Sequence, residues 1–260
     1  MCLFSRPVPF VSKTNIYARE APGVGQHLAY SMTFTVAESL AMILPLPVAP
    51  GSGDSAVSFT DLSGYPELFA DLQKGFPEET PLNRGGHVWS GGGAASPQPL
   101  PVVNMGSFEA SFVPTMNDFT RLDERFRIPA ETLVALGDYG SYGFAVIKLR
   151  PGAEQRLHPI ALTFPRADPT TLYFPTTHLH DGKVRERAEF DHSLFCQRVA
   201  RPMAGIPASV APEGPWRRSS LPLRSFARPM RAQGLLDGEA PCLRRVVRGT
   251  HPNHDIFVPA

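Results

Sequence analysis

Cysteine is scarce in this sequence, which has only Cys2, Cys196 and Cys242 among its 260 residues. A small and odd number of cysteines excludes the disulfide framework of many secreted domains and suits a reducing compartment. The first ten residues, MCLFSRPVPF, also lack the apolar run of a signal peptide. We therefore expect a soluble, cytoplasmic protein.

Long apolar runs and excess charge are missing too. The most apolar stretch, LAMILPLPV at residues 40–48, is short and broken by Pro45 and Pro47, so no membrane-spanning helix is expected. The formal net charge is only +1, which gives no overall attraction to nucleic acid or to membranes. Phosphate-binding loops, dinucleotide fingerprints and the GxSxG and HExxH motifs are absent from the sequence. The expected partner is thus an unidentified protein or a small molecule.

Proline and glycine are abundant, with 28 and 22 residues. Both interrupt regular elements, so short strands and many irregular connections are expected. Alternating apolar residues predict strands at residues 27–36 and 142–152, whereas helical spacing of apolar residues predicts a helix within residues 59–77. Two further short helices are predicted between Asn117 and Gly137. This order of elements predicts an α+β fold of mainly antiparallel strands with a few short helices.

The last quarter of the chain differs in composition from the rest. Residues 1–197 are predicted to form a single α+β domain, followed by an irregular proline- and arginine-rich arm at residues 198–260 that returns to the domain through residues 251–258. Between Gln197 and Thr250 there are ten arginines, no lysine and only three acidic residues. Such a basic segment either contacts phosphate or an acidic partner surface, or is a solvated arm.

Residues 173–197, YFPTTHLHDGKVRERAEFDHSLFCQ, concentrate histidine in a short span. Asp181-Gly182 is typical of a two-residue hairpin turn. His178 and His180 lie two positions apart before it, so on a strand their imidazoles project from one face. The strand that returns from this turn would bring further side chains towards the same face.

His192 and Cys196 share parity on that returning strand. Together with His178 and His180 they would complete a four-coordinate zinc site. Such a site would support a zinc-type hydrolase that uses a metal-activated water. Two alternatives stay open: a half-exposed polar strand pair with Cys196 in the core, and a pH-responsive interface.

Two other groups carry candidate chemistry. Cys2 becomes the first residue if the initiator methionine is removed, and its thiol and α-amine would then be nucleophile and base, or it could be a further metal ligand. Asp191 is the other candidate catalytic residue. The segment GTHPNHDIF adds His251, His254 and Asp255 as possible extra ligands, or else forms a solvent-exposed tail.

Four segments carry a family resemblance: YSMTFTVAESLAMILPLPV, TDLSGYPELFADL, FEASFVPTMNDFTRLDERFRIP and GDYGSYGFAVIKLRPG. In these segments, within about residues 11–197, the chain resembles a group of uncharacterised bacterial proteins assigned to domains of unknown function. The resemblance implies a fold in which a strand ends in a prolyl turn, a helix follows, and a glycine- and tyrosine-rich run leads into another strand. It implies no activity and no catalytic residues. The sequence therefore favours a binding or structural module, with the zinc-type hydrolase as the alternative.

Overall fold

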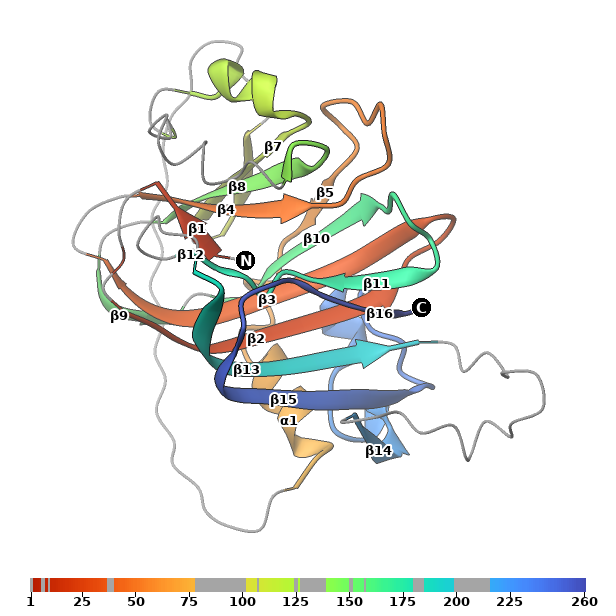
Figure 1. Cartoon of the computed structure of the whole chain (residues 1–260). Helices are drawn as coiled ribbons and strands as arrows, with labels where there is room; N and C mark the ends of the chain where they lie inside the picture. The colour runs from red at the N-terminus through yellow and green to blue at the C-terminus, as the bar shows by residue number, and fades with distance from the viewer. Residues whose placement is uncertain are drawn as a thin grey trace.

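Two large β-sheets, one stacked on the other, make up most of the computed structural model (Figure 1). The helix α1 (Leu68–Lys74) lies outside this stack in the same view. The structure describes residues 2–5, 8, 10–36, 40–77, 102–106, 108–123, 126, 139–149, 152–156, 158–179, 185–198 and 216–260.

The six-stranded sheet combines early and late segments of the chain. Most of its neighbouring strands are antiparallel, and only its first pair is parallel. In spatial order, its strands are β12 (His178–Leu179), β1 (Cys2–Phe4), β4 (Leu40–Leu46), β8 (Gly143–Leu149), β7 (Phe108–Val113) and β6 (Val102–Met105). All of β4 is buried, and a strand buried on both faces carries apolar side chains at every position, as the run LAMILPL does.

The eight-stranded sheet contains the longest strands. In spatial order, its path is β14 (Arg217–Pro222), β15 (Pro241–Pro252), β13 (Arg187–Gln197), β2 (Phe10–Glu20), β3 (Gly25–Val36), β10 (Ile160–Pro165) and β5 (Ser58–Thr60), and β9 (Gly152–Arg156) also pairs with β3. β13 is parallel to β2 and antiparallel to β15. A separate two-stranded sheet pairs β11 (Thr171–Phe174) with β16 (Ile256–Pro259).

Successive side chains of the central strands enter two different cores. Ile16 and Leu194 pack in the core between the two large sheets, whereas their neighbours Tyr17 and Phe195 pack on the other face. This follows from the two-residue period of a strand. That other face is covered by α1 (Leu68–Lys74) and by apolar residues from the stretch between β14 and β15.

The outer face of the six-stranded sheet is covered in a similar way. Val146 and Leu179 project from the sheet there, and they join Phe119 of the 3-10 helix η1 (Met116–Arg121) and Phe126 in a third apolar cluster. Both large sheets are therefore buried on two faces, which places many apolar side chains out of water in a chain that has few helices.

The α+β prediction is wrong, because the protein is mostly β-sheet. In the part of the chain that the structure describes, α1 is the one α-helix, and it has seven residues. The helix predicted within residues 59–77 is present as α1, Leu68–Lys74, and Ser58–Thr60 pairs with β10 as an edge strand. Residues Met116–Arg121 form a 3-10 helix instead of an α-helix, and the helix predicted up to Gly137 lies largely outside the described residues.

The prediction of an irregular C-terminal arm is also wrong for the described residues 216–260, which contain β14, β15 and β16. β15 pairs with β13 from Arg187 opposite Pro252 to Cys196 opposite Leu243. The alternation in β15 is obscured because neighbouring arginines occupy both kinds of position: Arg244 is buried, while Arg245 beside it is half-buried. A basic strand with its apolar positions interrupted in this way resembles a solvated segment in the sequence.

The predicted hairpin after His180 is not present as two neighbouring strands. β12 pairs with β1, and both edges of β13 are occupied by β2 and β15. β12 and β13 therefore belong to different sheets. The turn residues Asp181-Gly182 lie outside the described residues.

No helix among the described residues is long and apolar enough to cross a membrane.

The central position of β13 leads to a prediction about stability. Leu194 is fully buried between the sheets, so Leu194→Ala leaves a cavity and is expected to lower the free energy of unfolding by about 2–5 kcal/mol. Urea denaturation followed by circular dichroism measures this loss. Leu221→Ala, at a side chain that is 56% exposed, is the control and is expected to change it by less than about 0.5 kcal/mol. Equal losses in the two variants would contradict the placement of β13.

Candidate functional site

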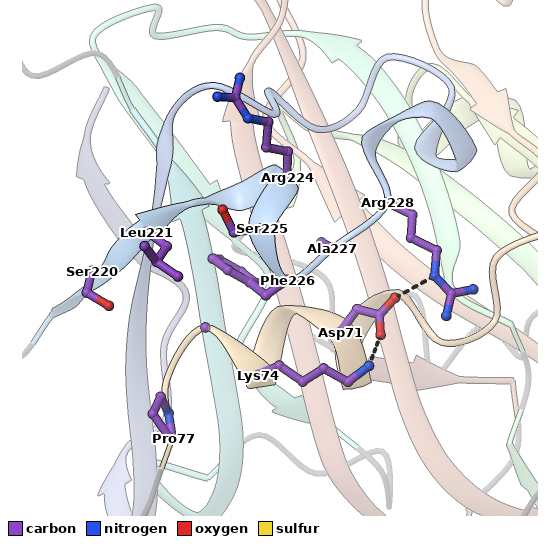
Figure 2. A pocket seen from close by; sticks show the side chains of 11 residues that line it. Asp71, Lys74, Pro77, Ser220, Leu221, Arg224, Ser225, Phe226, Ala227 and Arg228 are labelled. Carbon is purple, nitrogen blue, oxygen red and sulfur yellow. Dashed lines mark hydrogen bonds and ion pairs between the residues drawn. The ribbon is translucent and has the colours of Figure 1, made fainter.

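An open pocket of about 530 Å³ lies where α1 meets the segment that follows β14 (Figure 2). Gly75, just after the helix, allows the close approach of Phe226 from that segment. A Cβ atom at this position would lie 2.5 Å from the Phe226 ring, closer than real contacts permit. The contact of an aromatic ring with a glycine therefore forms part of the pocket lining.

The ionic groups of this pocket are arranged asymmetrically. Its only described carboxylate, Asp71, is buried and accepts a hydrogen bond from the Tyr65 hydroxyl at 2.9 Å. Lys74 Nζ and Arg228 Nε lie 2.5 and 3.4 Å from the same carboxylate, and Figure 2 shows them approaching it from two directions. The Lys74 and Arg228 side chains are 62% and 50% exposed, against 3% for the Asp71 side chain. The negative charge is therefore enclosed by protein, while the positive charges face water.

A second pocket of about 440 Å³ adjoins the first along β14. Ser220, Leu221 and Arg224 line both pockets. Arg218 adds a further exposed cation, and Glu239, the acidic residue of this pocket, forms an ion pair with Arg224. We call these two pockets, together with strand β14, the β14 surface.

β14 is an edge strand. It pairs with β15 on one side, and no other strand among the described residues pairs with its outer side. The register shifts between Arg218 and Pro222, so the edge is irregular. From residue 216 to residue 250 the chain has eight arginines and two acidic residues, Asp237 and Glu239, a formal charge of +6. The edge therefore lies in the most basic part of the described chain.

The structure brings two of the predicted metal ligands together. His178 in β12 and His192 in β13 face each other across the two sheets, with their Nε2 atoms 3.3 Å apart. His192 is buried and His178 is half-buried. The Phe190 ring packs against both imidazoles, with centroid distances of 4.5 Å to His178 and 5.1 Å to His192. We call His178 and His192 the histidine pair.

The other predicted ligands do not join this pair in the described structure. Cys196 lies on the same face of β13 as His192, but four residues of strand place it about 13 Å away. It is buried in the core between the sheets. His180 lies outside the described residues, as does the side chain of Cys2, whose main chain pairs with His178. Among the described residues, no group of three or more histidine, cysteine and acidic side chains is placed to hold a metal ion.

Asp255 is a structural anchor. The residue as a whole is only half-buried, but five donors surround its carboxylate. The donors are the N–H groups of Thr176 and Thr177, the Thr177 hydroxyl, and the hydroxyls of Tyr139 and Tyr173, at 2.8–2.9 Å. This network fastens the start of β16 to the segment that leads into β12.

The electrostatics of Asp255 agree with that role. Burial acts to raise the pKa of the Asp255 carboxyl, but the hydrogen bonds from Thr177 and Tyr139 are among the interactions that outweigh it, so the pKa is held below its ordinary value. Burial and the nearby Asp255 charge also raise the pKa of the Tyr173 hydroxyl, which therefore stays protonated and remains a donor.

The remaining candidates lie at the surface. Asp191 is exposed, accepts a hydrogen bond from the Lys13 N–H at 3.3 Å, and lies near Arg248. His251 is exposed, and its ring donates to the Arg248 carbonyl at 2.8 Å. His254 is exposed as well. None of these three side chains points to a shared ligand.

The β14 surface was missed in the sequence, although part of its signal is visible there. The sequence shows the arginine excess between Gln197 and Thr250. It does not show that part of this segment is an edge strand of a sheet. The pocket combines Lys74 with Arg224, which are far apart in the chain, and no local pattern connects them. The pair of glycine and phenylalanine at Gly75 and Phe226 is equally non-local.

Comparison with known proteins gives only a distant structural likeness. No protein-family model and no curated protein matches the chain. The chain is similar to the crystal structure of baculovirus P35, with 11% sequence identity, 96% of this chain and 97% of that chain covered, and a TM-score of 0.48. It is similar to P35 in a crystal structure of the caspase-8/P35 complex, with 9% identity, 96% of each chain covered and the same TM-score. A likeness of this size supports no assignment of function.

The Asp255 network predicts a pH-dependent contribution to stability. Asp255→Asn puts an amide that donates where five donors converge, and it is expected to lower the free energy of unfolding by about 2–3 kcal/mol at neutral pH. Because the folded pKa lies below the unfolded value of about 3.9, the stabilisation is complete above that value and is lost as the pH falls through the folded pKa.

Urea denaturation of the native chain and the variant between pH 7 and pH 3 measures this difference. The gap between the two is expected to stay constant down to about pH 5 and to shrink below about pH 4. Asp168→Asn changes a carboxylate in an exposed turn and is the matched control, with a much smaller loss expected. A gap that does not shrink in acid would contradict a charged Asp255.

Proposed function

We propose that this protein is a binding module whose β14 surface holds an extended, acidic segment of a partner protein. The observation that carries the proposal is a basic edge strand with two adjoining pockets along it, in which the cations are exposed and the one carboxylate beside α1 is already bound internally.

Edge pairing accounts for the extended form of the proposed segment. A strand at the edge of a sheet presents main-chain N–H and C=O groups that a second strand can pair with. β14 occupies this position in the eight-stranded sheet. Alternate side chains of an added strand point to the two faces of the sheet, so one set would lie over the pockets beside β14.

Charge selects the acidic composition. Arg218, Arg224, Lys74 and Arg228 are exposed along the β14 surface, and Glu239 is the exposed acidic residue among those that line the pockets. Complementary charge increases the rate of encounter and disfavours basic partners. The surface therefore favours glutamate- or aspartate-rich segments.

Apolar contacts would add to the charge. Leu221 is 56% exposed on β14 and lines both pockets. In the first pocket the half-buried Phe226 ring packs on Gly75. An apolar side chain from the partner that covers these groups would remove apolar surface from water, at about 25 cal/mol for each Å².

Charge reversal on the β14 surface tests the proposal. The probe is a labelled short peptide of alternating glutamate and valine, and its affinity is measured by fluorescence anisotropy at low and fixed ionic strength. The double variant Arg218→Glu/Arg224→Glu is expected to bind roughly tenfold more weakly or worse, because the added carboxylates repel the peptide. Arg185→Glu/Arg187→Glu is the matched control, because it reverses two exposed arginines at and just before the start of β13, and it is expected to bind like the native chain.

Three results would contradict the proposal. One is equal weakening in the control, which would show only a non-specific charge effect. The second is unchanged binding of a peptide whose alternate main-chain nitrogens are methylated, since methylation removes the donors needed for strand pairing. The third is tighter binding of a single-stranded oligonucleotide of similar length, which would identify a nucleic-acid surface instead of a protein-binding one.

A further inference from the structure

The histidine pair has no role in the proposed binding surface and needs an explanation of its own. The two imidazoles come from different sheets, His178 from the six-stranded sheet and His192 from the eight-stranded sheet. Their contact bridges the sheets next to the core that both sheets share. The geometry points to a site for one divalent transition-metal ion, with zinc as its best fit, held by His178 Nε2 and His192 Nε2.

The separation of the nitrogens fits such an ion. Zinc–nitrogen bonds are about 2.0–2.1 Å long, and two ligands at tetrahedral corners are then about 3.3–3.4 Å apart. The two Nε2 atoms lie 3.3 Å apart. Without an ion, the same separation suits one ring donating a hydrogen bond to the other. An ion would take the place of that shared proton, and the donor ring would change to the tautomer protonated at Nδ1.

Both rings are held before any ion arrives. The main chain of His178 is clamped by Asn253, whose Oδ1 accepts from the His178 N–H at 2.7 Å and whose Nδ2 donates to its carbonyl at 3.0 Å. Phe190 packs against both rings. His192 is 3% exposed and lies on a strand paired on both sides. Ligands that are already in place lose little freedom on binding, which strengthens the site.

The chemistry of the ligands selects the class of ion. Neutral imidazole is a good ligand for zinc, copper, nickel and cobalt, whereas calcium and magnesium require oxygen ligands. The remaining positions of a four-coordinate ion would be filled by water or by further groups of the protein.

Metal binding to tag-free protein tests the site. Titration of the apo-protein with zinc, followed by calorimetry, is expected to show one ion per chain and a rise in Tm. Titration with cobalt is expected to give the visible absorption of tetrahedral coordination. His178→Gln and His192→Gln are each expected to weaken binding by roughly tenfold or more. Each removes a metal ligand, and even the loss of a residue that hydrogen-bonds to a ligand typically weakens binding by about tenfold or more. His254→Gln, which removes an exposed histidine nearby in the sequence, is the control and should bind as the native chain does.

A second measurement avoids dependence on the variants, since His192→Gln changes a buried group. Nuclear magnetic resonance of the native chain resolves the ring nitrogens of its eight histidines. Zinc is expected to shift the Nε2 signals of His178 and His192 far more than those of the other six. The site is refuted if the native chain shows no saturable binding, if binding persists in both glutamine variants, or if zinc shifts the signals of other histidines instead.

Discussion

β13 is hydrogen-bonded along both edges, in parallel to β2 and antiparallel to β15. This pairing joins a strand near the N-terminus to one about 180 residues later, and it sets which strands lie next to them in the eight-stranded sheet. Phe195 points into the core under α1, and Leu194 points into the core between the sheets. Two cores and the histidine pair include side chains of this strand.

Two positions along β13 support different surfaces. At its middle, His192 faces β12 across the sheets. At its end, Gln197 is buried and holds the loop that leads into β15, because its amide donates to the Asp237 carbonyl at 2.7 Å and its Oε1 accepts from the Asp237 N–H at 2.9 Å. Tyr17 donates to the same oxygen at 2.7 Å. These bonds fix the turn from which β15 positions β14, so one strand aligns both the histidine pair and the β14 surface.

Local patterns in the sequence predicted the strands at residues 27–36 and 142–152, whose alternation is visible within a few residues. The sheet partners were not predictable in this way, because nothing in the span of residues 173–197 indicates that β12 pairs with β1 at the chain's start. A hairpin was the predicted reason for His178 and His192 to meet. They meet instead because the six-stranded and eight-stranded sheets stack. Cys196 shared their parity but not their position, since parity gives the face of a strand and not the distance along it.

The near-neutral charge of the whole chain conceals a local field. Asp71 is enclosed by Tyr65, Lys74 and Arg228, so its charge is balanced inside the protein. Asp255 is likewise surrounded by donors. Lys74 and Arg228 share one carboxylate, so this cluster keeps a net positive charge. A net charge of +1 therefore coexists with a basic β14 surface, and the local charge, not the total, is the basis of the acidic partner segment proposed above.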